Sequence, residues 1–226
     1  MKIVALIPFW LDYKTSINGI ECRPLIHIGG ESLINRTVKM LNRVDSIDEV
    51  VVFSSNEIFL DSLNDEAQYK FLKRSKHLDS NDVSIEDVIE NFLLNSDADI
   101  IVLIHPKSPF IRPETIQDCI NKVLSPDFDS AFVASLVRKH AWFKGELINC
   151  SRNGDTPLLP NIDPILVETS SVYVFTRELF DSERHRIGEK PYVKEVGHFE
   201  GLEIEREDDF EMAELIINAG LDRERS

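Results

Sequence analysis

The chain has 226 residues, of which 42% are hydrophobic and 29% charged, a composition that fits a globular protein with a sizeable core and excludes a disordered one. Its net charge of −15 opposes binding to nucleic acid or to an anionic membrane, so we expect neither partner. No stretch approaches the ~20 apolar residues of a membrane span. Three widely spaced cysteines, Cys22, Cys119 and Cys150, predict reduced thiols and a cytoplasmic protein.

The first half of the chain predicts alternating strands and helices. The apolar run from Ile3 to Ile7 indicates a buried strand that ends at Pro8, followed by a loop of roughly 20 residues at the strand's carboxyl end, where open α/β sheets bind ligands. Further strands are expected at residues 49–53, 71–74, 100–104 and 130–137. Helices are expected at residues 32–42, 58–68 and 84–94 and from Pro113 onward. This alternation predicts an α/β protein with a doubly wound, mostly parallel sheet.

The second half departs from this alternation. Residues 139–166 contain many turn residues and little helix signal, which predicts hairpins or an extended arm. A strand at 171–175, a short helix at 177–180 and strands at 192–196 and 203–205 should return the chain to the sheet. The closing helix, 208–219, is expected to bury Phe210, Ala213, Leu215 and Ile216. We therefore expect a single domain over residues 1–226, with residues 139–166 as an arm within it.

Seven short motifs follow one another in an order that is informative as a set. They are Ile7-Pro8, Arg23-Pro24-Leu25 with Gly30-Glu31-Ser32-Leu33-Ile34, Phe53-Ser54-Ser55-Asn56, Arg74 with Asn81-Asp82-Val83-Ser84, His105-Pro106-Lys107-Ser108-Pro109-Phe110, Glu168-Thr169-Ser170-Ser171-Val172-Tyr173, and Glu203-Ile204-Glu205 with Asp208-Asp209-Phe210. Through these motifs, and over almost its whole length, the chain resembles the acylneuraminate cytidylyltransferases (CMP-sialic acid synthetases) and their Kdo relatives.

The resemblance implies a nucleotidyltransferase (GT-A-like Rossmann) fold with an extended dimerisation arm, and hence a homodimer. It implies transfer of CMP from CTP to an acidic sugar or related acceptor, with release of pyrophosphate. The catalytic residues would be Arg23 and Lys14. The nucleotide would be bound by Ile7, Pro8, Phe9, Arg23, Arg74, Val83, His105 and Ser108, and the acceptor by Lys144, Thr169 and Tyr173.

Glu203 and Glu205 stand where the resembled family has its paired metal aspartates, which implies a site for Mg²⁺ or Mn²⁺. They alternate across Ile204, so on a strand both carboxylates would point to one face. The alternative is a solvated strand end in an acidic protein. The other candidates also have ordinary structural interpretations, with surface positions for Arg23, Lys14, Arg74 and Lys144, a turn for Ser108 and a structural role for His105.

The chain departs from the family pattern at two places that concern chemistry. The phosphate-binding loop carries Phe9 and the residues up to Lys14 where the family has an arginine and a Gly-Ser-Lys turn. Residues 159–164 lack the family arginine that would pair with a sialic acid carboxylate, so ordinary sialic acid is not the expected acceptor. Two alternatives stay open: a catalytically inactive paralogue that binds a ligand or regulates, and another nucleotide-sugar enzyme.

Overall fold

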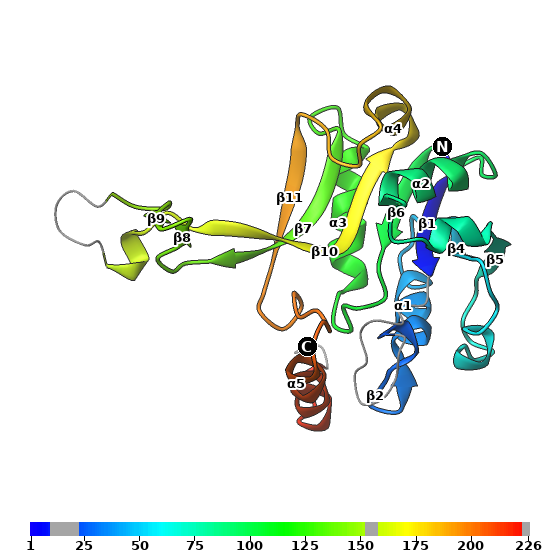
Figure 1. Ribbon diagram of the computed structural model, residues 1–226, viewed down its shortest axis with the longest axis horizontal. Helices are drawn as coiled ribbons and strands as arrows, with labels where there is room; N and C mark the ends of the chain where they lie inside the picture. The colour runs from blue at the N-terminus through cyan, green and yellow to red at the C-terminus, as the bar shows by residue number, and fades with distance from the viewer. Residues whose placement is uncertain (10–22, 152–157, 223–226) are drawn as a thin grey trace.

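The computed structural model describes residues 1–9, 23–151 and 158–222, which form a central seven-stranded sheet (Figure 1). The strand order is β11-β7-β10-β6-β1-β4-β5. The strands are β1 (Ile3–Phe9), β4 (Glu49–Ser54), β5 (Lys70–Lys73), β6 (Ile100–Ile104), β7 (Ser130–Val137), β10 (Ile165–Thr176) and β11 (Pro191–Val196). Only β10 runs antiparallel to its neighbours in this sheet, so the predicted mostly parallel α/β fold is confirmed.

Helices cover both faces of the sheet, because its central strands are apolar on both sides. Helices α1 (Leu33–Leu41) and α3 (Pro113–Val123) pack on one face, and α2 (Ile85–Leu93) and α4 (Arg177–Glu183) on the other. Strand β1 alternates between the two cores, with Ile7 in the first and Leu6 in the second. Its carboxyl end therefore stands between two fully packed layers.

Helix α5 (Glu207–Asn218) closes the described chain below the carboxyl ends of the parallel strands (Figure 1). It packs against the short hairpin of β2 (His27–Ile28) and β3 (Glu31–Ser32) in a further core that contains Ile28, Ile204 and Ala213. The predicted buried side of this helix is correct for Ala213 and Ile216. It is wrong for Leu215, whose side chain is 64% exposed, because only a narrow stripe of the helix faces the hairpin.

The prediction that Pro8 ends the first strand is wrong, since β1 continues to Phe9. Pairing with β6 stops at Leu6, whereas pairing with β4 continues until Phe9 lies opposite Ser54. Proline lacks the N–H of a ladder bond and is tolerated where a strand has lost one neighbour. The strand is therefore longer than predicted, and its last backbone group belongs to Phe9.

The predicted helix at residues 58–68 is absent; this described segment contains only the 3₁₀ turn η2 (Leu60–Ser62) and irregular turns. The side chains of Asn35 and Asn42 on α1 bind its backbone, through Asn64 N at 3.0 Å and Gln68 N at 2.9 Å. These tertiary bonds satisfy backbone groups that a helix would otherwise have used. The buried ring of Phe59 anchors the segment against Phe9.

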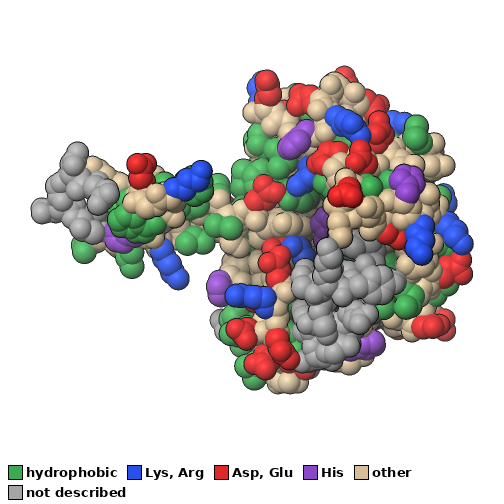
Figure 2. Space-filling view, viewed as in Figure 1, with side chains coloured by type: hydrophobic (Ala, Val, Ile, Leu, Met, Phe, Trp, Pro, Cys, Tyr) green, Lys and Arg blue, Asp and Glu red, His purple; other side chains and the backbone are tan. Residues whose placement is uncertain are grey.

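An arm projects from the body over the described residues 138–151 and 158–166 (Figures 1 and 2). It contains the segment that leaves β7, the hairpin of β8 (Trp142–Phe143) and β9 (Glu146–Leu147), the 3₁₀ turn η4 (Leu159–Asn161) and the start of β10. The Asn149 amide ties its strands together by donating to Lys139 O at 2.8 Å and Asp163 O at 2.9 Å. Large apolar side chains remain open to solvent on the arm, including Trp142 at 58% and Phe143 at 61% exposed. No helix within the described residues has both the length and the apolarity to cross a membrane.

Candidate functional site

Arg74 ties together the carboxyl ends of β1 and β4. Its side chain is fully buried and donates to Phe9 O and Phe53 O, each at 3.0 Å, and to Asp79 Oδ1 at 2.7 Å. Asp79, from η3 (Lys76–Asp79), also accepts a short hydrogen bond from Ser55 Oγ. Burial lowers the pKa of Arg74, and Asp79 opposes that shift. Arg74 is thus a buried structural cation at the edge where a nucleotide is predicted to bind, and its contact with a base stays a prediction.

The loop after β6 carries His105, Lys107 and Ser108. His105 N donates to Ser171 O at 3.1 Å, so the loop is fixed to β10. Burial lowers the pKa of His105 to about 3, with Lys107 and Arg186 adding to the shift, so the imidazole is neutral at pH 7. Ser108 is only 5% exposed, and its Oγ has no hydrogen-bond partner in the described chain. The Ser108 hydroxyl therefore holds no other described residue in place through a hydrogen bond.

The residues predicted to bind the acceptor, Thr169 and Tyr173, lie at a register shift in β10. The pairing with β7 is irregular between Glu168 and Tyr173, as at a β-bulge, which can re-aim side chains. Thr169 Oγ1 bonds to Val133 O at 3.0 Å and to Ser171 Oγ at 2.7 Å, so its hydroxyl bonds within the sheet. The Tyr173 hydroxyl donates to Glu168, and burial followed by this bond raises its pKa to about 12. Tyr173 pairs with Leu103 near the end of β6, whereas the Thr169 hydroxyl is directed to β7.

Glu203 and Glu205 meet at one cation, the Lys107 ammonium. Lys107 Nζ lies 3.3 Å from Glu203 Oε1 and 3.1 Å from Glu205 Oε1. The predicted strand at residues 203–205 is absent, but Ile204 N donates to Lys107 O at 2.8 Å and Ile204 is fully buried. This bond, with the one from Glu205 N to Asp209 Oδ2 at 3.0 Å, fixes the backbone here, and both carboxylates contact the same ammonium although no strand forms. Burial raises the pKa of Glu203, although Lys107 opposes the shift.

The carboxylate pair has donors that suit a divalent cation. Glu203 Oε1 is buried, with the Lys107 ammonium as its ion-pair partner among the described residues, and carboxylate oxygens are preferred ligands of Mg²⁺. No cluster of three or more His, Cys, Asp or Glu side chains within the described ranges is placed to hold a metal. The pair would supply two ligands, and substrate phosphates and water the rest, as is usual for nucleotide-bound Mg²⁺. The donor set fits the ion, and the ammonium now lies between the two carboxylates.

The remaining predicted residues are scattered. The side chains of Ile7 and Phe9 are buried, and the Phe9 carbonyl accepts from Arg74. Val83 packs against the core of the α2 face, in the turn that precedes α2. Lys144 lies in the β8–β9 turn of the arm, far from the β6 loop (Figure 1). Arg23 begins η1 (Arg23–Leu25), and Lys14 lies outside the described residues.

Sequence reasoning missed Arg186, which follows α4. Its guanidinium lies 4.4 Å from the centre of the Tyr173 ring, and its Nη1 donates to Glu86 Oε1 at 2.8 Å. Its Nε is buried and has no partner among the described residues. No local pattern could have identified Arg186, because Glu86 and Tyr173 come from distant segments. Sequence reasoning took Lys107 as a positive charge at the rim of the site and missed its pairing with Glu203 and Glu205, which follow almost 100 residues later.

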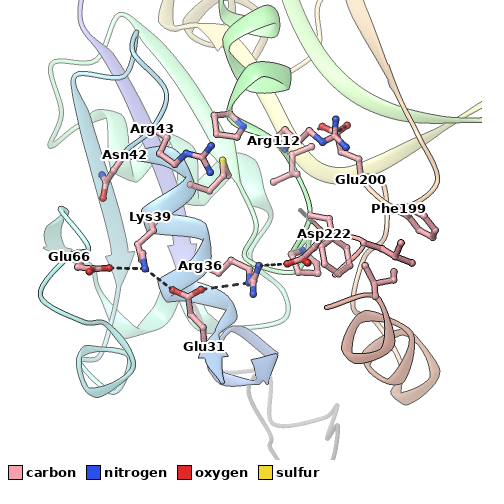
Figure 3. A pocket seen from close by; sticks show the side chains of 17 residues that line it. Glu31, Arg36, Lys39, Asn42, Arg43, Glu66, Arg112, Phe199, Glu200 and Asp222 are labelled. Atoms are coloured by element: carbon pink, nitrogen blue, oxygen red, sulfur yellow. Dashed lines mark hydrogen bonds and ion pairs between the residues drawn. The ribbon is translucent and has the colours of Figure 1, made fainter. Parts of the chain in front are cut away.

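A separate cavity of 610 Å³ lies between α1, the start of α3 and α5 (Figure 3). Its charged lining is largely paired with itself: Lys39 Nζ lies 2.8 Å from Glu66 Oε2, and Arg36 makes long contacts of 3.8 Å to Glu31 and 3.9 Å to Asp222. None of the residues predicted for the nucleotide, acceptor or metal lines this cavity. The candidate site is therefore the polar region around the β6 loop.

The sheet order, the helices on both faces and the polar site at the carboxyl ends of β1 and β6 define an α/β nucleotidyltransferase fold. A family model described as Cytidylyltransferase matches residues 17–194, most of the chain, so the protein belongs to the cytidylyltransferase family. A search of curated proteins found no match.

Two solved structures illustrate the fold. The structure of CMP:2-keto-3-deoxy-manno-octonic acid synthetase complexed with CTP has a TM-score of 0.70 at 15% identity, over 97% of this chain and 100% of that one. The 4-diphosphocytidyl-2C-methyl-D-erythritol synthase from Anaerococcus prevotii has a TM-score of 0.62 at 15% identity, over 96% of each chain. Likenesses at this identity establish the fold and leave the acceptor to be argued from the site.

Proposed function

We propose that this protein transfers CMP from CTP to an acidic sugar or related acceptor and releases pyrophosphate. The observation that supports this most is the convergence of Glu203, Glu205 and Lys107 beside the β6 loop, in a chain of the cytidylyltransferase family. Charged groups at the carboxyl ends of parallel strands are placed where open α/β sheets bind their ligands.

In this reaction an acceptor hydroxyl oxygen bonds to the α-phosphorus of CTP, and the bond from that phosphorus to the α–β bridging oxygen breaks. Pyrophosphate leaves with the electron pair, and the hydroxyl proton passes to solvent. Such transfers depend on in-line positioning and neutralisation of phosphate charge. Glu203 and Glu205 would hold Mg²⁺ or Mn²⁺, which when bound supplies that neutralisation. Arg23 and Lys14 are the proposed phosphate contacts, and the backbone at Pro8 with His105 and Ser108 the proposed nucleotide contacts.

The acidic character of the acceptor is supported by Arg186. Its guanidinium lies beside Tyr173, and its buried Nε has no partner in the described part of the chain. An arginine in this position can pair with a carboxylate, which is the group that residues 159–164 of the arm are not equipped to bind. We propose that Thr169 and Tyr173 border the acceptor on the same side.

We also propose a homodimer. The arm exposes Trp142, Phe143 and Ile148, and a two-stranded hairpin cannot bury such side chains by itself. Lys144 lies at the tip of this hairpin, so it can serve an acceptor site only if the arm reaches a second copy. A dimer therefore accounts both for the apolar arm and for the predicted role of Lys144.

The test is pyrophosphate release from CTP, measured with Mg²⁺ and with Mn²⁺ against a panel of acidic sugars and matched neutral sugars. We expect turnover with an acidic sugar only. In the Glu203→Gln, Glu205→Gln double variant, turnover should fall at least ~100-fold while the unfolding midpoint persists, because the pair then lacks the charge to hold the cation. Release of pyrophosphate with neutral sugars alone would contradict the acidic acceptor.

One observation favours a second candidate, an inactive ligand-binding paralogue. The Lys107 ammonium already compensates one of the two negative charges of the carboxylate pair without a metal. If CTP binds equally well in EDTA, and no acidic sugar gives turnover with either metal, this second function replaces the first.

A further inference from the structure

We propose that the Lys107 ammonium and a divalent cation occupy the Glu203–Glu205 pair in turn. In the nucleotide-free protein the ammonium holds the pair. When the cation enters, the ammonium leaves and binds the nucleotide phosphates. The part of this inference that concerns the nucleotide rests on the function proposed above, whereas the competition for the pair does not.

The backbone on both sides of the pair is fixed, so the exchange needs movement of side chains alone. Ile204 N donates to Lys107 O at 2.8 Å, and Lys107 N donates to His105 O at 2.8 Å. Ile204 is fully buried in the core shared with β2 and α5. The carboxylates of Glu203 and Glu205 therefore stay beside the lysine backbone, while its ammonium sits on a flexible four-carbon stem.

The two cations exclude each other because they need the same oxygens. Glu203 Oε1 is buried and lies 3.3 Å from Lys107 Nζ, its ion-pair partner among the described residues. A divalent ion would lie at about 2 Å from its carboxylate ligands, which places it against an ammonium 3.1 and 3.3 Å from those oxygens. Two positive charges at that separation repel strongly in a site where the Lys107 and Glu203 side chains are only 15% and 18% exposed.

The displaced ammonium is placed to bind the phosphates of the nucleotide. Lys107 lies in the loop that also carries Ser108, whose buried hydroxyl has no partner within the described ranges. A lysine binds phosphate as a mobile point charge, and an incoming triphosphate brings more negative charge than the carboxylate pair. After the exchange, the divalent ion would be bound by the two carboxylates and the Lys107 ammonium by the phosphates.

The test measures Mn²⁺ binding to the nucleotide-free protein by electron paramagnetic resonance. Lys107→Met should bind Mn²⁺ at least tenfold more tightly than wild type, because the competing ammonium is gone. Lys190→Met removes an exposed lysine at the start of β11 and should match wild type. Adding Glu203→Gln to Lys107→Met should abolish the gain. Equal Mn²⁺ affinity in wild type and Lys107→Met would overturn the proposal.

For the nucleotide, the proposal predicts that the Lys107→Met substitution weakens binding, whereas it strengthens binding of Mn²⁺. Lys107→Met should bind CTP with Mg²⁺ at least tenfold more weakly than wild type, and unchanged CTP affinity would overturn this part of the proposal. A merely structural lysine would not tighten one ligand and weaken the other. Because the Mn²⁺ comparison needs neither CTP nor acceptor, failure of the proposed transfer and failure of this competition appear in different assays.

A measurement on wild type keeps the proposal falsifiable if the variants fold poorly. Reductive methylation with formaldehyde, followed by peptide mass spectrometry, reports the reactivity of each lysine amine. Lys107 should react several-fold faster with saturating Mn²⁺ than without it, and Lys190 should not change. Lys107 reactivity that is insensitive to Mn²⁺ would overturn the exchange.

Discussion

At the scale of single residues, Arg74 carries the largest expected effect on stability. Removing its side chain leaves Asp79 and the carbonyls of Phe9 and Phe53 buried without their donor. Breaking a buried ion pair from one side typically costs about 3–5 kcal/mol. We therefore expect Arg74→Met to lower the free energy of unfolding by about that amount, measured by urea denaturation.

The neighbouring lysine is the matched control. Lys73 makes only a long surface contact of 3.7 Å to Glu57, so Lys73→Met should change the free energy of unfolding by less than about 0.5 kcal/mol. If Arg74→Met is as stable as this control and loses only CTP affinity, Arg74 is a binding residue, as the sequence predicted, and the buried bonds contribute little.

His105 should make the protein less stable in mild acid. Its pKa is lowered from 6.5 to about 3 in the folded protein by burial, so between these values the unfolded chain binds the extra proton. Stability attributable to His105 is therefore complete above pH 6.5 and is lost as the pH falls towards 3. The loss approaches about 1.4 kcal/mol per pH unit, since each unit of pKa shift is worth that amount.

The measurement compares urea unfolding of wild type and His105→Gln at several values between pH 7 and pH 4. Glutamine does not titrate there, so the variant should lose less stability on acidification. Carboxylates titrate in both proteins and cancel in the difference. Parallel stability curves for the two proteins would contradict the low pKa of His105.

At the scale of elements, α2 depends on its capping box. Ser84 Oγ accepts from Asp87 N at 3.1 Å, and Asp87 Oδ2 accepts from Ser84 N at 3.0 Å. Ser84→Ala should lower the free energy of unfolding by about 1 kcal/mol, because it leaves an orphan N–H in the first turn. Ser84→Asn keeps an acceptor oxygen and should stay within a few tenths of wild type. An equal loss in both variants, in thermal or urea unfolding, would show that the cap is not the cause.

At the scale of the whole molecule, the arm should control the oligomeric state. Trp142 and Phe143 are both more than half exposed, and buried aromatic anchors at an interface are typically worth about 2 kcal/mol or more each. We expect wild type to sediment as a dimer at micromolar concentration and the Trp142→Ser, Phe143→Ser double variant as a monomer.

The control removes apolar side chains from the body. Leu94 and Leu124 end α2 and α3 and are 77% and 47% exposed, so Leu94→Ser with Leu124→Ser should leave the sedimentation mass unchanged. A wild-type mass equal to one chain would rule out the dimer and with it the role of Lys144 at a second copy's site.

The sequence determined the elements whose signal is local. Strands β6 and β7 have the predicted bounds, because the apolar run of β6 and the apolar first half of β7 are buried between helices on both faces of the sheet. The start of α2 was predictable from its cap, and the arm from its turns. The order of these elements and of the short motifs also identified the fold and the cytidylyltransferase family, while the narrower resemblance to the acylneuraminate enzymes stays a prediction.

Only the tertiary structure decided what depends on contacts between distant segments. Residues 58–68 bond to side chains of α1 in place of forming a helix, and Leu215 faces solvent because α5 meets only a narrow hairpin. The partners of Lys107 and Arg186 lie about 100 positions away in the chain, so no local pattern indicates that Lys107 joins Glu203 and Glu205. The sequence placed two carboxylates at the site, and the fold placed the Lys107 ammonium beside both, which compensates the charge of the largely buried Glu203.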